Sequence, residues 1–360
     1  MRVLAVDVGT GTQDILLFDS ELELENCTQM VIPSPTQLVA RQIREATAAR
    51  EAIFLTGVTM GGGPCAWAAE DHLRAGLPIY AIPPAARTFD DDLANVERMG
   101  VRLADRPPRD TRRIEMRDFD LPAILASLDC FGITPEIDAV AVAVFDHGAA
   151  PPGVSDRRFR FEYIAETVAK NDLAAFAYLR DEIPASLTRM AAVADSTPDD
   201  MPLLVMDTGP AAVLGALEDA RVRGAATALV VNVGNFHTLA FHVEGERILG
   251  LFEHHTGELL PARLEAYLRK LADGTITNAE VFADKGHGAL VAAPAARLPE
   301  LLAVVGPRRG LLAGSALRPY FAVPHGDMML AGCFGCLRAL ARKRPDWRPN
   351  IEQALDRAAI

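Results

Sequence analysis

Short apolar runs that end in polar or glycine residues divide this chain into predicted strands and helices. The first run covers residues 3–6 and leads into Asp7 and a Gly-Thr-Gly-Thr turn, and a second run over 15–18 follows at hairpin distance. Residues 21–28 show an alternation of polar and apolar residues that leads into a predicted third strand. Residues 36–55 are predicted to form a helix followed by a buried strand. The chain is therefore expected to open with a three-stranded ribbon followed by a helix.

The same order of elements recurs in the second half. Strands are predicted over 228–231, 239–243 and 247–252, and helices follow over 258–272 and 277–283. A repeat of a whole ribbon and its helices indicates a duplicated architecture.

The segment 56–135 interrupts this repetition. Gly61-Gly62-Gly63-Pro64 opens an alanine-rich helix, and a short strand is predicted over 78–81. We predict an inserted, partly irregular subdomain here. It belongs to a first domain over 1–205, followed by a second domain over 206–325 and a connecting helix over 326–360 that returns to the first domain.

Composition restricts the class of protein. The 360 residues are 50% hydrophobic and 23% charged, which suits two globular domains better than one core. The net charge of −12 disfavours nucleic acid as the main partner, although a local cluster of backbone N–H groups still binds a small anion. No run reaches the roughly 18 apolar residues of a membrane helix. With five cysteines and no apolar leader, we expect a cytoplasmic protein with reduced thiols and no membrane partner.

The turn after the first strand is a candidate phosphate site. Gly9 and Gly11 allow a tight turn whose backbone N–H groups point to one place, and the hydroxyls of Thr10 and Thr12 add donors. Asp7, at the strand end, suits a magnesium ion because hard cations prefer oxygen ligands. An ordinary Gly-Thr hairpin turn is the alternative.

A second glycine turn repeats this layout. Asn232 ends an apolar strand, Gly234 and Asn235 form the turn, and His237 and Thr238 begin the next strand. Two such turns facing each other can hold a polyphosphate from both sides.

Two further segments accompany the turns. Asp207 precedes the helix that starts at Pro210-Ala211-Ala212, and it is our candidate to orient water or a substrate hydroxyl. Gly306 follows a strand over 301–305, and a helix of small residues is predicted over 328–343.

This order of ribbon, helix, ribbon, strand–glycine turn and helix resembles the actin/hexokinase/heat-shock-chaperone ATPase superfamily. The resemblance implies an α/β fold of duplicated ribonuclease-H-like domains with ATP and Mg²⁺ in an interdomain cleft. It places Asp7 at the metal, the two turns at the phosphates and Gly306 at the adenosine, with Gly332 and Gly335 in a close-packed connecting helix. Two departures, Asn232 in place of an acid and Gly209 before the first connecting helix, favour nucleotide binding over fast catalysis.

More narrowly, four motifs resemble a small prokaryotic family labelled pyruvate formate-lyase activating enzyme. They are DVGTGTQDILLFD at the start, MGGGP at 60–64, EHHTG at 253–257 and GHG at 286–288. A glycyl-radical activase holds its iron–sulfur cluster with three cysteines on a short loop, and this sequence has no such triplet. We therefore do not expect a radical-SAM activase.

Other candidates are weighed against structural roles. Gly61, Gly62 and Gly63 at a helix start suit an anionic substrate or a close-packed turn. Asp146 and His147, at the end of a buried strand, are candidate substrate ligands or buried structural residues.

Two clusters of residue types also have alternative roles. His237, His254, His255 and His287 form a metal cluster or are hydrogen-bonded singly. Cys333 and Cys336 are either cluster ligands or small residues in tight helix packing. The triplet at 90–92 is interpreted as a solvated loop or a helix cap.

The function predicted from these patterns is an ATP-dependent phosphotransferase or ATPase whose acceptor is an unidentified small molecule or protein. One alternative is a non-catalytic, nucleotide-gated binding protein, favoured by Asn232 and Gly209. The other is an ATP-driven redox activator with an iron–sulfur cluster that bridges two subunits, which rests on Cys333 and Cys336 and on a homodimer.

Overall fold

A six-stranded sheet built around the N-terminal ribbon forms the first layer of the computed structural model, which describes residues 1–170, 172–295 and 297–357. Its strands, in the order β3-β2-β1-β8-β10-β9, are β3 (Thr28–Pro33), β2 (Thr12–Asp19), β1 (Arg2–Val8), β8 (Ala139–Val144), β10 (Leu203–Asp207) and β9 (Ala177–Leu179). The first three strands are antiparallel, and β8 and β10 continue the sheet parallel to β1. The third strand begins at Thr28, later than predicted, because the preceding residues Leu24–Asn26 form a 3-10 turn.

The second sheet repeats this topology. Its strands, in the order β14-β13-β12-β11-β15-β16, are β14 (Gly288–Val291), β13 (Arg247–His255), β12 (His237–Glu244), β11 (Thr227–Val233), β15 (Leu301–Val305) and β16 (Tyr320–Phe321). Here too an antiparallel ribbon is extended by strands parallel to its first member. The duplicated ribonuclease-H-like architecture of the actin-like ATPase fold, predicted from the sequence, is confirmed.

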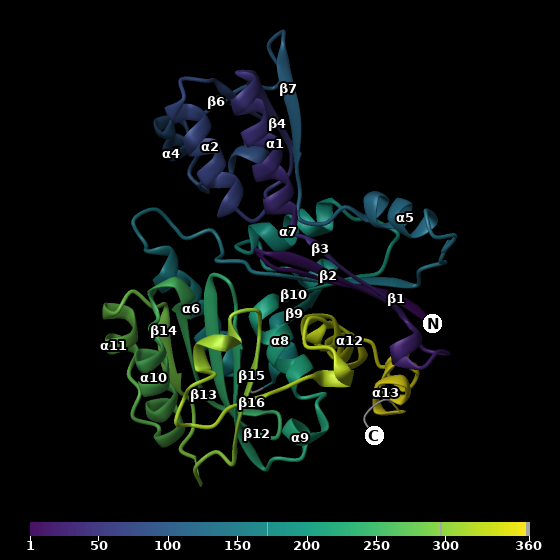
Figure 1. The fold of residues 1–360 in the computed structure, drawn as a ribbon, viewed down its shortest axis with the longest axis vertical. Helices are drawn as coiled ribbons and strands as arrows, with labels where there is room; N and C mark the ends of the chain where they lie inside the picture. Colours follow the sequence, from purple (N-terminus) through teal and green to yellow (C-terminus); the bar gives the residue numbers. More distant parts are fainter. Residues whose placement is uncertain (171, 296, 358–360) are drawn as a thin grey trace.

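A third sheet, with order β6-β5-β4-β7, projects from the other two at the top of Figure 1. Its strands are β4 (Ala52–Gly57), β5 (Ile79–Ala81), β6 (Arg102–Leu103) and β7 (Thr111–Met116). All are parallel, and helices α1 (Pro35–Ala49), α2 (Pro64–Arg74) and α4 (Leu93–Met99) contribute to a separate hydrophobic core. An additional subdomain is therefore present, but it is a regular parallel sheet with helices and its bounds differ from the predicted 56–135. The sheet begins at β4, whereas α5 (Leu121–Asp129) packs on the first sheet.

Helices α8 (Thr208–Ala216) and α12 (Ala331–Lys343) cross between the first two sheets. A Cβ atom on Gly215 would lie 1.7 Å from the carbonyl oxygen of Ala331, and one on Gly335 would lie 1.9 Å from that of Ala211. Because the backbones touch at both glycines, neither position accepts a larger residue without moving a helix. This contact confirms the close-packed pair of connecting helices that the resemblance implies.

The remaining helices cover the sheets and termini. They are α3 (Pro83–Ala86), α6 (Asp156–Val168), α7 (Thr188–Asp195), α9 (Ala220–Arg223), α10 (Pro261–Asp273), α11 (Asn278–Ala283) and α13 (Arg348–Arg357). The largest hydrophobic cluster runs from the first sheet through α8 and α12 into the second sheet. Within the described residues, every helix is too short or too polar to cross a membrane.

Candidate functional site

The turns after β1 and β11 are each closed by the same type of backbone hydrogen bond. The N–H of Gly9 donates to the carbonyl of Thr12 at 3.0 Å, and the N–H of Gly234 donates to the carbonyl of His237 at 2.9 Å. The turns face each other directly, since a Cβ atom on Gly11 would lie 2.5 Å from the Nδ2 atom of Asn235. Gly11 and Asn235, which are 224 positions apart in the chain, thus lie on opposite sides of one space.

A pocket with about 870 Å³ of empty volume lies between the turns. The sequence-predicted residues on its walls are Asp7, Gly9, Thr10, Thr12, Asn232, Gly234, Asn235, His237 and Gly306. Gly11 packs against Asn235, and Thr238 is buried beneath the second turn, where its hydroxyl lies 2.9 Å from that of Thr256. We call this space the turn pocket.

Two carboxyl groups face the turn pocket from neighbouring strands. Asp7 and Asp14 are paired across the β1–β2 hairpin, and the hydroxyl of Thr208 donates to Asp7 Oδ1 at 2.6 Å. Burial raises the pKa of Asp7 to about 7, against the hydrogen bond from Thr208. Burial and the charge of Asp7 raise the pKa of Asp14 to about 8. Among the described residues, the buried Oδ1 of Asp14 has no hydrogen-bond partner.

Asp14 was not predicted as a site residue, although the hairpin contains the signal. A turn closed between Gly9 and Thr12 fixes the register, and that register sets Asp14 opposite Asp7. An oxygen-rich pair with an unsatisfied oxygen is the donor set that a hard divalent cation takes.

Asp207 lies beneath the turn pocket and not on its wall. Its carboxylate is fully buried, forms an ion pair with Arg160 and accepts the N–H of Gly209 at 3.1 Å. Burial raises the pKa of Asp207, against the charge of Arg160. The geometry makes Asp207 a partner of Arg160 and does not present it to water or substrate.

Arg160 itself joins the first and second sheets. From α6 it donates to Asp207 on β10, to both carboxylate oxygens of Glu253 on β13 (3.1 and 3.3 Å from Nε) and to the carbonyl of Asp146 at 2.8 Å. Its side chain is completely buried. One of several arginines in a charged helix, it carries no sequence signal that distinguishes it from its neighbours.

A wider second pocket, with about 1570 Å³ of empty volume, adjoins the first, and both share Gly9, Thr10 and His237. The sequence-predicted substrate residues on its walls are Gly61, Gly62, Gly63, Asp146 and His147. We call this space the acceptor pocket.

The contacts of these residues separate two roles. The N–H of Gly61 donates to the carboxylate of Asp118, and the carboxylate of Asp146 accepts the N–H groups of Gly148 and Met190 at 2.8 and 2.9 Å. These groups therefore hold loops in place. The side chain of His147, by contrast, is exposed to the acceptor pocket.

The triple glycine forms a close-packed contact at the rim. Gly63 has φ 59°, and a Cβ atom there would lie 2.6 Å from the ring of Phe236 in the second turn. One helical turn on, the ring centroid of Trp67 lies 5.4 Å from that of Phe236. Helix α2 of the third sheet thus touches the second turn across the pocket mouth.

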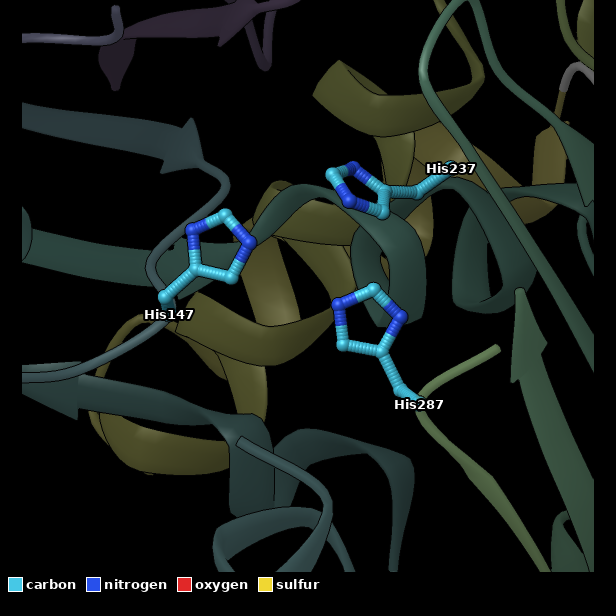
Figure 2. Close-up of side chains that lie close together, drawn as sticks. All are labelled: His147, His237 and His287. Atoms are coloured by element: carbon cyan, nitrogen blue, oxygen red, sulfur yellow. The ribbon is translucent and has the colours of Figure 1, made fainter. Parts of the chain in front are cut away.

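Three histidines converge at the boundary of the two pockets. Side-chain nitrogens of His147, His237 and His287 all lie within 4.8 Å of one another (Figure 2). His255 packs against His237 and His287, with ring centroids 5.0 and 4.6 Å away. His254 points elsewhere, with its Nε2 3.5 Å from Asp284. The predicted cluster is thus partly correct: His254 is outside it and His147 inside.

Burial sets the charge of these imidazoles. It lowers the pKa of His287 to about 2, helped by the charge of Arg160, and it lowers that of His237 well below the ordinary value. Burial against its neighbours and the charge of Arg160 also lower the pKa of His147 well below the ordinary value. All three rings are therefore neutral at physiological pH and keep a nitrogen lone pair free.

A family model assigns the chain. The model described as "Putative pyruvate format-lyase activating enzyme (DUF1786)" matches residues 60–311, more than half of the 360 residues. The chain belongs to this family. The match includes the triple glycine, His147, the second turn and His287.

Similar solved structures differ widely in sequence. The ethanolamine utilization protein EutJ from Carboxydothermus hydrogenoformans is 16% identical (94% of this chain, 89% of that chain, TM-score 0.33). The ROK hexokinase from Thermus thermophilus is 15% identical (100% and 88%, TM-score 0.26), and the Aquifex aeolicus Ppx/GppA family member is 10% identical (100% and 87%, TM-score 0.26). No curated protein sequence matches the chain.

The two cysteines of α12 are packing residues in this family member. Cys333 and Cys336 are fully buried, and the thiol of Cys333 lies 3.2 Å from the carbonyl of Asp14. Burial raises the pKa of both thiols well above the ordinary value. The alternative of a cluster bridging two subunits was wrong, because neither sulfur reaches the surface. Asp92, as predicted, caps a helix by accepting the N–H of Ala94.

Proposed function

We propose that this protein binds ATP with Mg²⁺ in the turn pocket and transfers the terminal phosphoryl group to an acceptor or to water. The supporting observation is that two glycine turns of the same closure face each other and share one pocket with Asp7 and Gly306. Turns of this kind concentrate backbone N–H groups on one anion.

The phosphates are assigned to the turns and to the start of α8. The hydroxyls of Thr10 and Thr12 and the first residues of α8, Thr208 and Gly209, line the pocket. The positive end of the α8 dipole favours an anion at this position. The adenosine is assigned to Gly306, where φ is +98° and a Cβ atom would lie 2.5 Å from Asn232 Oδ1.

Asp7 and Asp14 are the residues that would hold Mg²⁺. Their buried carboxyl groups face one another, and the unsatisfied oxygen of Asp14 fits an oxygen-binding cation. When bound, Mg²⁺ neutralises phosphate charge. The protein's own contribution is to fix Asp7 through Thr208 and to close the site around the phosphates.

The acceptor is assigned to the second pocket. Gly9 and Thr10 line both pockets, so a phosphoryl group held at the first turn is adjacent to the acceptor pocket. We propose that the acceptor is a small molecule or a protein side chain that enters beside His147. The polar walls there suit a polar group.

A second candidate, a nucleotide-gated binding protein without turnover, is favoured by two side chains. Asn232 stands where the first turn has Asp7, and Asp207 is engaged by Arg160. An amide does not neutralise a cation as a carboxylate does.

Calorimetric titration of Mg²⁺ and ATP, followed by phosphate release on the same samples, separates these functions. Wild type is expected to bind, and Asp7→Asn to bind at least about tenfold more weakly and to lose about 10²–10³-fold in release. Asp19→Asn, at the far end of the same hairpin, is the matched control. Binding without release selects the gated protein, and absence of binding in wild type contradicts the proposal.

A further inference from the structure

Three motifs in the sequence, Asp-His-Gly at 146–148, Glu-His-His at 253–255 and Gly-His-Gly at 286–288, have no role in nucleotide binding as proposed above. The structure brings a histidine from the first and third of them together with His237. His147 follows β8, His237 opens β12 and His287 immediately precedes β14. Figure 2 shows the three rings arranged around one common point.

The buried nitrogens of this cluster lack partners. His287 is 1% exposed, and neither of its ring nitrogens has a hydrogen-bond partner among the described residues. The Nε2 atom of His237 is likewise buried and unpaired there. Leaving buried polar atoms unpaired is unfavourable, so three neutral imidazoles directed at one point indicate a ligand that accepts all their lone pairs.

The backbone holds the histidines in this arrangement. The N–H of His287 donates to the carbonyl of Glu253 at 2.9 Å, and Arg157 donates to the carbonyl of Gly286 at 2.8 Å. A Cβ atom on Gly288 would lie 2.2 Å from Asn278 Oδ1, so only glycine fits after His287. On the opposite side, Gly148 has φ +75° and donates to the carboxylate of Asp146. Both flanking loops are therefore fixed.

The surrounding charge is compatible with a cation. Three arginines lie near the cluster. Arg160 is paired with the carboxylates of Asp207 and Glu253 and Arg189 with that of Asp118, whereas Arg157 donates to the carbonyls of Phe282 and Gly286. The ring of Phe145 lies between Arg160 and the cluster, 4.0 Å from the guanidinium carbon and stacked 4.0 Å from the ring of His237. The buried group of Arg160, Asp207 and Glu253 carries one more negative than positive formal charge, so it does not itself repel a cation at the histidines.

We propose that His147, His237 and His287 form a binding site for a divalent transition-metal ion of the zinc class. Imidazole nitrogens suit such ions, whereas the carboxyl pair at Asp7 and Asp14 suits Mg²⁺. Zinc–nitrogen bonds of about 2.0–2.1 Å in a tetrahedron set the nitrogens about 3.3 Å apart, so the rings close by about 1–2 Å on binding.

Three protein ligands leave one coordination position open. His147 and His237 line the acceptor pocket, so the open position faces that space. An oxygen donor of the acceptor, such as a hydroxyl or carboxylate, is the chemical group that would occupy it. The metal site thus lies beside the phosphate-binding turns without sharing their carboxylates.

The test uses metal ions alone, so its outcome is independent of nucleotide binding. Chelator-treated protein without a histidine tag, in a Cys130→Ser background because that free thiol is exposed, is titrated with Zn²⁺ by calorimetry and with Co²⁺ by visible absorption. One ion per chain is expected. His147 is chosen because its side chain is exposed, so the fold is expected to tolerate its loss. Loss of a residue that only supports a metal ligand weakens metal binding roughly 10–100-fold, and His147→Ala is expected to weaken it by more than that.

Two controls locate the ion. His242→Gln, on the same strand as His237, and Asp14→Asn, in the carboxyl pair, are expected to keep Zn²⁺ and Co²⁺ binding within about threefold of wild type. The proposal is overturned if the Cys130→Ser parent binds neither ion, if His147→Ala binds as tightly as that parent, or if Asp14→Asn loses binding to the same extent. Azide is expected to bind at the open coordination position and to shift the Co²⁺ absorption spectrum. An unchanged spectrum would contradict the presence of an open coordination position.

Discussion

The two glycine turns have the same backbone and different side chains. In the first, Asp7 faces Asp14 across the hairpin, whereas in the second the corresponding pair is Asn232 and Leu239. The residue whose carbonyl closes the turn is Thr12 in one and His237 in the other. The first turn therefore presents oxygen and negative charge, and the second presents an amide and a neutral imidazole.

This difference shows how a duplicated scaffold divides its chemistry. The repeated fold supplies two anion-binding turns in fixed opposition, and the side chains around each turn suit a different kind of cation. Arg160, the buried link between the two sheets, lies where these environments meet. Replacing Arg160 is expected to have the largest effect among the changes that follow.

Arg160→Met is expected to cost about 3–5 kcal/mol of unfolding free energy, because Asp207 and Glu253 are left buried without a counter-charge. Arg158→Met, on the same helix and paired with Glu162 at the surface, is the control and is expected to change stability by less than about 1 kcal/mol. Urea unfolding of both variants measures the difference. Equal effects would mean that Arg160 does not join the two halves.

Making the two turns alike in charge is expected to change nucleotide binding and turnover. Asp7→Asn gives both turns an amide, and phosphate release should fall about 10²–10³-fold. Asn232→Asp gives both turns a carboxylate, and the Mg²⁺ concentration for half-maximal ATP binding should fall severalfold, about 1 kcal/mol. Titrations at several Mg²⁺ concentrations check this. No change in Asn232→Asp would place that residue away from the metal and phosphates.

Glu218, which follows the C-terminal end of α8, is a carboxylate whose pKa is lowered, whereas the pKa values of Asp7 and Asp14 are raised. Burial alone would raise the pKa of Glu218, but the neighbouring His325 (3.7 Å away), hydrogen bonds from Arg338 and the charges of Arg338 and Arg223 lower it to about 2. Because the folded pKa is depressed, its stabilisation is complete above pH about 5 and is lost as pH falls from about 4.5 toward 2.

Glu218→Gln should therefore cost roughly 2–3 kcal/mol at pH 7 and little at pH 2. Thermal unfolding of wild type and variant across this range measures the convergence. Glu352→Gln, also near Arg338 but more exposed, is the control and should show a smaller pH-dependent difference. Parallel curves for wild type and Glu218→Gln would contradict the lowered pKa.

The smallest expected effect concerns one hydroxyl. Thr10 occupies the position that Asn235 occupies in the second turn, and Thr10→Val removes one donor to a phosphate. ATP affinity should fall about tenfold, as loss of a hydrogen bond to a charged group predicts. Thr111→Val, at the start of β7, is the matched control in the same calorimetric titration. Equal affinity in wild type and Thr10→Val would remove that hydroxyl from the phosphate site.

The parts of the fold that the sequence predicted are those with local patterns. The ribbon from Val3 to Phe18 and its repeat after 227 show long apolar runs bounded by glycine turns, and both are present. In the third sheet, β4 and β5 coincide with predicted strands. Strands β6 and β7 were missed, because β6 has two residues and β7 lies in an arginine-rich segment without a long apolar run.

In the candidate site, too, local features were predicted from the sequence and non-local contacts were not. The turns were found because each lies within one short segment, and Asp14 was missed although its register was readable. The convergence of His147, His237 and His287 depends on how three loops from two sheets meet, which no spacing in the chain encodes. The pairing of Asp207 with Arg160 is equally non-local, and it removes Asp207 from the role that its position before α8 suggested.

The contact between Trp67 and Phe236 gives the protein an optical signal of its own. The sequence has two tryptophans, and the other, Trp347, stacks beneath Arg344 near the C-terminus. Trp67 is half-exposed and touches the second turn from the third sheet, so separation of these two parts changes the surroundings of its indole. In a Trp347→Phe background, the emission of a single native residue therefore follows opening and closing of the pocket mouth without an added dye.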